Sequence, residues 1–218
     1  MQLAQLHARI ERLVQDSDKV ITAPDIQDAI QQALAVYSKD RPLQRVADVV
    51  ATGEYHLDVP PQWHASSSVV RMEYPVGAIP ARYLDPAEIT VYQSLTGPVF
   101  HLCVLPAVGA PVRVTFLCPH VADDTELTIS EQDAHALACL SASYCCAQLA
   151  AHYAQEGSST INASTVDHNA KTERWASVAR NLRKTYSTEI GVRDEVKQAA
   201  AGTVVSLEAP VRRRFFRA

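Results

Sequence analysis

The first 45 residues alternate apolar and polar positions with the period of an α-helix. Apolar residues recur at three- and four-residue steps in residues 3–13, which predicts an amphipathic helix that ends near Asp18. A second helix is expected to begin at Thr22, an N-cap residue with Asp25 three positions later, and to stop at Pro42. Because only a few residues join these two helices, we expect them to lie antiparallel.

From about Val46 to Val121 the pattern changes to short alternating runs separated by proline and glycine, which is typical of strands and turns. About five strands are expected, enough for a small antiparallel sheet or sandwich. They are predicted at residues 55–59, 70–74, 89–93, 99–105 and 112–116. The third and fourth form a predicted hairpin around Thr96-Gly97-Pro98, with a loop longer than the tightest type.

The alternation also predicts which side chains face the core of this β region. In residues 70–74, Val70 and Met72 are expected on the buried face. In residues 112–116 the apolar positions are again expected inside, and Thr115 is expected on the outer face.

Helical periodicity returns at Ser130, where Asp133 three residues later predicts a capping-box-like start. The expected apolar face consists of Leu137, Leu140, Tyr144, Ala147 and Ala151. Cysteines and leucines extend the apolar character around this helix, so it should be central, buried on several sides and ended by Gly157. A fourth helix with a stripe over residues 175–186 should stop at Gly191, and four helices can close a bundle.

These elements predict an α+β fold. It is mainly an α-helical bundle of about four helices, with an inserted antiparallel β-sheet region and an extended C-terminal arm. The expected division is 1–45 for the first two helices, 46–121 for the inserted β region, 122–191 for the last two helices and 192–218 for the arm. With 218 residues, 47% hydrophobic and only 7 glycines, the chain is not a disordered, collagen-like or low-complexity protein.

Net charge and the N-terminal sequence exclude several further classes of function. The formal net charge of -4 gives no global basic field that would hold nucleic acid or an anionic membrane. The N-terminal residues 1–16 carry charges every few positions, which fits neither a signal peptide nor a membrane span. We therefore expect the protein to fold in a cytoplasm and to have no membrane partner.

The 5 cysteines offer the strongest alternative to a structural role. Cys145 and Cys146, with His135 and His152, suggest a thiol nucleophile or a metal site. Small apolar cysteines in a buried helix are more often packing residues, and no CxxC or HExxH spacing supplies a zinc site. Common nucleotide-binding, hydrolase and kinase motifs are also absent from the sequence. We expect no enzyme activity, metal or cofactor, and a small thiol enzyme stays as the alternative.

The C-terminal TVVSLEAPVRRRFFRA has strand-forming residues, arginines and two phenylalanines, but no visible core of its own. Such an arm suits docking onto a protein by edge pairing and side-chain anchors. Phosphate contact through the arginines, or a frayed tail, are the other interpretations. The expected partner-binding residues are Val204, Val205, Leu207, Arg212, Arg213, Arg214, Phe215, Phe216 and Arg217.

Several stretches, taken in order, resemble a known family. They are AIQQALAVYSKDRP, GEYHLDVP, VVRMEYPVG, IPARYLDPAEITVY, PVRVTFLCPH, ISEQDAHALACLSASYCCAQLAAHYA and STINASTVDHNAKTERWASVARNLRKTYSTEIG. Over about residues 20–191 the chain resembles the head-to-tail adaptor proteins, also called connector, neck or head completion proteins, of tailed double-stranded-DNA bacteriophages.

The resemblance implies a virion structural protein at the junction of capsid and tail, assembled in the cytoplasm of the host bacterium. It implies self-association into a ring, typically of twelve copies, beneath the portal protein. The ring would extend the channel through which DNA passes without specific binding, and would dock the next neck or tail protein. In similar adaptors the C-terminal arm reaches into the portal. A neck protein one layer further out, for head closure or tail completion, is the alternative within this resemblance.

Overall fold

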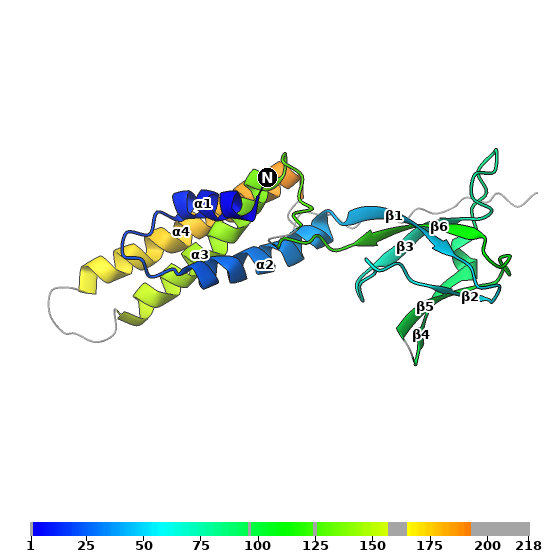
Figure 1. The fold of residues 1–218 in the computed structure, drawn as a ribbon. Helices are drawn as coiled ribbons and strands as arrows, with labels where there is room; N and C mark the ends of the chain where they lie inside the picture. The colour runs from blue at the N-terminus through cyan, green and yellow to red at the C-terminus, as the bar shows by residue number, and fades with distance from the viewer. Residues whose placement is uncertain (1, 96, 124–125, 157–164, 193–218) are drawn as a thin grey trace, which may run out of the picture.

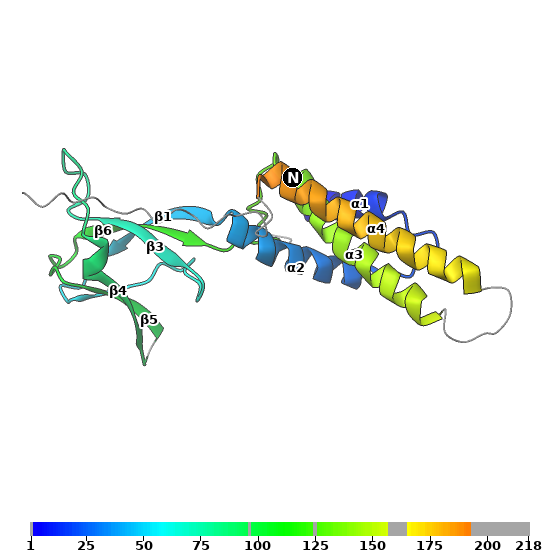
Figure 2. The same ribbon diagram turned by 180° about the vertical axis from the view of Figure 1, so that it is seen from behind.

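The computed structural model describes residues 2–95, 97–123, 126–156 and 165–192. These residues form an elongated molecule, with a helical bundle at one end and a β region at the other (Figures 1 and 2). The helices come from both ends of the described chain and the strands from its middle, which confirms the expected α+β fold with an inserted antiparallel β region.

The bundle contains four α-helices. They are α1 (Leu3–Val14), α2 (Ala23–Asp40), α3 (Ala134–Glu156) and α4 (Thr165–Ile190). The first ends earlier than the expected Asp18, because Gln15 adopts the left-handed conformation with φ of 49°. The second begins as predicted: the Asp25 carboxylate accepts a hydrogen bond of 2.8 Å from the Thr22 amide.

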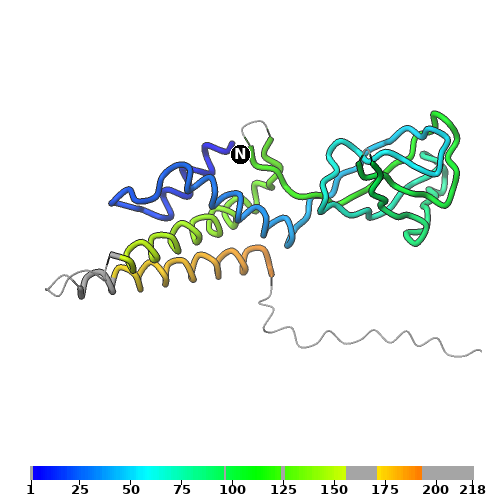
Figure 3. Tube along the Cα trace, turned by 90° about the horizontal axis from the view of Figure 1, so that it is seen from below, coloured from blue at the N-terminus to red at the C-terminus, as the bar shows by residue number. Residues whose placement is uncertain are grey.

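Helix α3 is the centre of the bundle. It contacts all three other helices, and α4 lies beside it along its length (Figure 3). The two first helices run antiparallel as expected, although α1 packs mainly on α3 and only slightly on α2 (Figure 1). The buried leucines and cysteines of α3 lie on more than one side of the helix, which confirms that it is buried on several sides. Two positions of its expected apolar face, Ala147 and Ala151, are exposed instead. The expected stop at Gly157 lies outside the described residues.

The length and hydropathy of α3 would also allow it to cross a membrane. Within the part of the chain that the structure describes, Ala134–Gln155 is the one such candidate, with a mean hydropathy of 1.2 over its most apolar window. However, 72% of that window is buried inside the protein. Its apolar surface is therefore used in the core of the bundle.

The β region contains two three-stranded antiparallel sheets, with strand orders β1-β6-β3 and β2-β5-β4. The strands are β1 (Leu43–Val50), β2 (His56–Asp58), β3 (Ser68–Glu73), β4 (Ile89–Ser94), β5 (Gly97–Leu102) and β6 (Pro111–Cys118). A short 3-10 helix, η1 (Pro86–Glu88), leads into β4. Strand β1 is the one that the sequence did not predict, because Arg45 lies on its inner face while Val46 and Val50 lie on its exposed face.

The core of the β region lies between the two sheets. Met72, Phe100 and Phe116 are fully buried there, and the ring of Trp63 meets that of Phe100 edge-on at 4.9 Å. Thr115, expected outside, is only 4% exposed. It lies on the central strand β6 between cross-strand neighbours on β1 and β3, which cover it.

Two local departures from the expected pattern come from the way strands pair. A β-bulge between Val69 and Arg71 places one extra residue in β3, so Val70 turns outward and is 43% exposed, whereas Val69 packs against the core. The predicted hairpin joins β4 and β5, but Ser94 pairs with Gly97, so its loop has only two residues and is shorter than expected.

The bulged register of β3 predicts different losses of stability for substitutions at Met72 and Val70. Met72→Ala should lower the free energy of unfolding by about 2–5 kcal/mol, because it leaves a cavity between the sheets. Val70→Ala should cost less than about 1 kcal/mol, because that side chain is already half exposed. Urea denaturation of both variants measures the difference. Equal losses would contradict the bulged register.

Candidate partner-binding site at the root of the C-terminal arm

All nine partner-binding residues expected in the arm lie outside the described residues. The structure does describe where the arm begins, at residues 190–192, which we call the arm root. Helix α4 ends at Ile190, Gly191 takes a φ of 76°, and Val192 packs against the helical core. A positive φ is available to glycine at low cost, so the predicted stop at Gly191 is confirmed as a change of chain direction.

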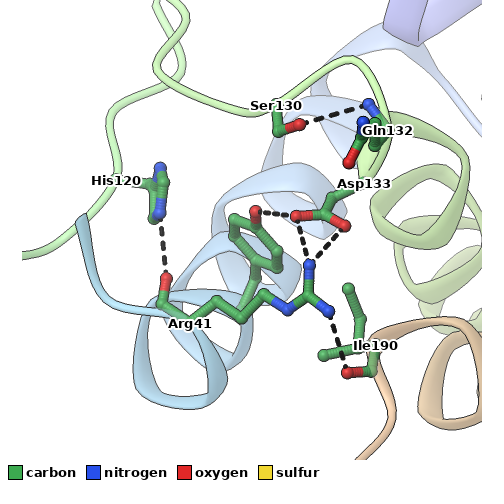
Figure 4. A network of polar contacts seen from close by, with 7 residues as sticks. Arg41, His120, Ser130, Gln132, Asp133 and Ile190 are labelled. Atoms are coloured by element: carbon green, nitrogen blue, oxygen red, sulfur yellow. Dashed lines mark hydrogen bonds and ion pairs between the residues drawn. The ribbon is translucent and has the colours of Figure 1, made fainter. Parts of the chain in front are cut away.

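An ion pair between the half-exposed Arg41 and the buried Asp133 holds the arm root in place (Figure 4). The Arg41 guanidinium donates to both carboxylate oxygens of Asp133, at 2.7 and 2.9 Å, and the Tyr37 hydroxyl donates to the same carboxylate at 2.7 Å. The other terminal nitrogen of Arg41 donates to the carbonyl oxygen of Ile190 at 3.1 Å. One arginine therefore connects the end of α2, the start of α3 and the last turn of α4.

The chemistry of this contact explains its position. The last four carbonyl groups of a helix have no partner within the helix, and they lie at its partially negative end. Arg41 supplies both a donor and a positive charge to that end of α4, while Asp133 balances the charge. The planar guanidinium can make these bonds at the same time, which a lysine cannot do with the same geometry.

Asp133 was expected to cap α3 together with Ser130. The Ser130 hydroxyl instead accepts from the amide of Gln132 at 3.2 Å, and the Asp133 carboxylate turns away to Arg41 and Tyr37. Burial, followed by the hydrogen bond to Asp133, raises the pKa of Tyr37 well above its usual value. This tyrosine therefore stays a neutral donor to the carboxylate.

His120 ties the same region to the β region. Its backbone amide donates to the Ser38 hydroxyl at 3.0 Å, and its ring Nε2 lies 2.9 Å from the carbonyl oxygen of Arg41. Nδ1 lies 3.2 Å from the carbonyl oxygen of Thr128 and 3.0 Å from the hydroxyl oxygen of the same residue, so both ring nitrogens lie beside hydrogen-bond acceptors. Burial lowers the pKa of His120.

Beside the arm root, α4 carries a cationic groove that sequence reasoning missed. The groove has a volume of about 380 Å³ and is lined by Arg180, Arg183, Lys184, Ser187, Thr188 and Val192. Among the described residues, none of its three cations forms an ion pair with a carboxylate. The spacing of these cations, at i, i+3 and i+4 beside the inward stripe of α4, is the sequence signal that could have identified the groove.

The cysteines fit packing better than catalysis. Cys118, Cys139, Cys145 and Cys146 are buried, and all five cysteines are free thiols. Burial raises the pKa of Cys139 and Cys145 to about 11 and that of Cys146 to about 12. A nucleophilic cysteine needs the opposite shift, because the thiolate is the reactive form.

The arrangement closest to a thiol site joins α3 and α4. The Cys139 sulfur lies 3.7 Å from Nε2 of His135, and the same nitrogen lies 3.6 Å from a carboxylate oxygen of Glu189. A catalytic relay uses both ring nitrogens of the histidine, one for the thiol and one for the carboxylate. Glu189 also contributes to raising the pKa of the thiol, so the trio does not activate it. No cluster of three metal-ligating side chains occurs among the residues that the structure describes.

Comparison with known proteins returns no relative: no family model matches the chain, and no curated protein matches it.

Loss of the Asp133 carboxylate should destabilise the fold. In Asp133→Asn, Arg41 and Tyr37 lose their charged acceptor, and the free energy of unfolding should fall by about 1–3 kcal/mol. Asp48→Asn, which removes the partner of Arg113 at an exposed position, is the matched control and should have a smaller effect. Urea denaturation of both variants measures the two losses of unfolding free energy. Equal losses would show that the buried Asp133 carboxylate contributes no more to stability than the exposed Asp48 carboxylate.

The His120 environment predicts a pH dependence. Since its pKa is lowered in the folded protein, the unfolded chain takes up a proton below about pH 6.5 that the folded protein does not. Stability should be complete above that pH and should fall as the pH is lowered through it. The loss between about pH 7.5 and about pH 5.5 should be smaller in His120→Gln than in the unchanged protein. The same slope of stability against pH in both proteins would show that His120 does not cause this loss.

Proposed function

We propose that this chain is a structural protein of a phage virion, a head-to-tail adaptor that forms a ring beneath the portal protein. The ring extends the DNA channel and docks the next neck or tail protein, and the C-terminal arm anchors each subunit to the portal. The order of sequence features over about residues 20–191 is the basis of this proposal.

The observation that carries the anchoring role is the fixed arm root. An arm transmits a binding force to its subunit only if its first residues are held by the fold. Here Ile190 is bonded to Arg41, and Val192 packs on the helical core. The arm root therefore has the rigid attachment that an anchor requires.

The distribution of charge supports the same role. The chain as a whole is acidic, with a formal charge of -4, so a ring of such subunits would repel DNA phosphates and let the genome slide. The cationic groove on α4 lies beside the arm root, and its positive charges, which have no carboxylate partner among the described residues, suit an acidic surface of the partner. The groove and the arm would then contact the portal together.

The alternative thiol enzyme finds little support in the described site, because burial raises the pKa of the buried cysteines, and Glu189 beside His135 raises that of Cys139 further. A neck protein one layer further from the capsid would use the same arm root and groove on a different partner. The identity of that partner is therefore the property to test.

The test mixes the purified protein with the portal ring encoded by the same genome and images the mixture by negative-stain electron microscopy. The full chain should form a ring stacked coaxially on the portal, and a chain that ends at residue 202 should leave the portal bare. A full chain that does not bind the portal would contradict the proposal and favour the next neck layer.

A charge reversal on α4 refines this test. Arg183→Glu should weaken portal binding at least about tenfold, because it places a negative charge in the cationic groove. Arg174→Glu makes the same change on the same helix outside the groove and should bind nearly as the unchanged protein does. Equal binding by both variants would remove the groove from the interface.

A further inference from the structure

A second groove lies in the β region, far from the arm root along the chain. It has a volume of about 260 Å³ and lies between the first half of β3 and the start of β4. Its apolar lining consists of Val69, Val70, Pro86, Ile89 and Val91. Both strands are at the edges of their sheets, so the groove is bordered by two edges instead of by the faces of paired strands.

The backbone of β4 is open toward this groove. Cys103 donates its amide to the carbonyl of Glu88, and Leu102 donates its amide away from β4, to Tyr55. In an antiparallel pair the residues that bond to the partner strand alternate with residues that point away from it. By this alternation Val91 directs its amide away from β5, and the structure gives no backbone partner for it among the described residues. The amide of Ile89, in contrast, donates to the carbonyl of Pro86.

The edge of β3 is covered over only half its length. The amide of Leu84 donates to the carbonyl of Met72 at 2.9 Å, and the amide of Tyr74 donates to the carbonyl of Arg82 at 3.1 Å. The chain around Arg82 and Leu84 therefore runs beside the second half of β3 and covers its edge. Residues 68–70, which border the groove, have no such cover among the described residues. An apolar groove beside an open strand edge is the geometry that accepts an added strand.

We propose that residues 203–208 of the chain's own arm add to β4 as an extended strand in the free subunit. In the sequence TVVSLE the side chains alternate, so Val205 and Leu207 share one face, and Val204, Ser206 and Glu208 share the other, more polar face. The apolar face fits a groove lined by valine, isoleucine and proline, while the polar face remains in water. Val91, now 50% exposed, is covered by the added strand.

The tether between the arm root and this strand is long enough. The contact between Arg41 and Ile190 places the root within one side chain of the segment that enters β1 at Leu43. The 11 residues from 193 to 203 span up to about 36–40 Å when extended. A region as large as residues 46–121 has a diameter of about 30 Å, so the arm can reach any of its edges.

A tethered strand also has an advantage over a free partner. Its effective concentration beside the groove is on the order of millimolar, which favours the subunit's own arm over the arm of another copy. Docking would cover the apolar residues of the arm until another partner binds it. The assignment concerns the free subunit and does not depend on what that partner is.

Hydrogen–deuterium exchange of the full chain tests the proposal. The amide of Val91 should exchange about tenfold more slowly in the unchanged protein than in Val205→Asp with Leu207→Asp, because the double variant cannot place its charges in the groove. The matched control is Val204→Asp with Ser206→Asp, which adds the same charge to the opposite face of the strand and should keep the slow exchange. All three proteins retain every residue of the folded body.

Two results would overturn the proposal. Equal exchange at Val91 in the unchanged protein and the Val205/Leu207 variant would show that the arm does not cover β4. Protection that weakens on dilution over about a hundredfold range of protein concentration would show that the strand comes from another copy. Slow exchange that is independent of concentration and lost only in the Val205/Leu207 variant is the expected result.

Discussion

The ion pair between Arg41 and Asp133 is the contact on which the arrangement of the molecule depends. It lies where the chain passes from α2 into β1, where α3 begins and where α4 ends, so three segments far apart in sequence meet at the guanidinium of Arg41. Breaking such a contact leaves a charge without its partner in a partly buried place. This pair and the packing of Val192 on the helical core together hold the arm root against the bundle.

His120 and Arg45 extend the same junction into the β region. His120, which follows β6, bonds to Ser38 and Arg41 at the end of α2, and Arg45 of β1 pairs with Glu126. The two chain segments that connect the bundle to the β region are thus joined by side chains as well as by the backbone. A force applied to the arm root would reach the whole subunit and not α4 alone, which suits a protein that holds two parts of an assembly together.

Much of the fold could be predicted because helical and strand periods are local properties of the sequence. The Thr22 cap, the central α3 and the β4–β5 hairpin needed only neighbouring residues. The outward turn of Val70 and the partners of Asp133 could not be predicted, because a bulge and an ion pair are set by residues distant in the chain. The cationic groove was visible in the sequence as spacing on α4, but only the fold shows that it lies beside the arm root.

Cross-linking mass spectrometry of purified virions tests the central claim most directly. Lys184 lines the groove beside the arm root and has an exposed amine for a cross-linker. We predict that the chain is present in virions and that Lys184 is cross-linked to the portal protein. Absence of the chain from virions, or cross-links from Lys184 only to proteins on the tail side, would contradict the account.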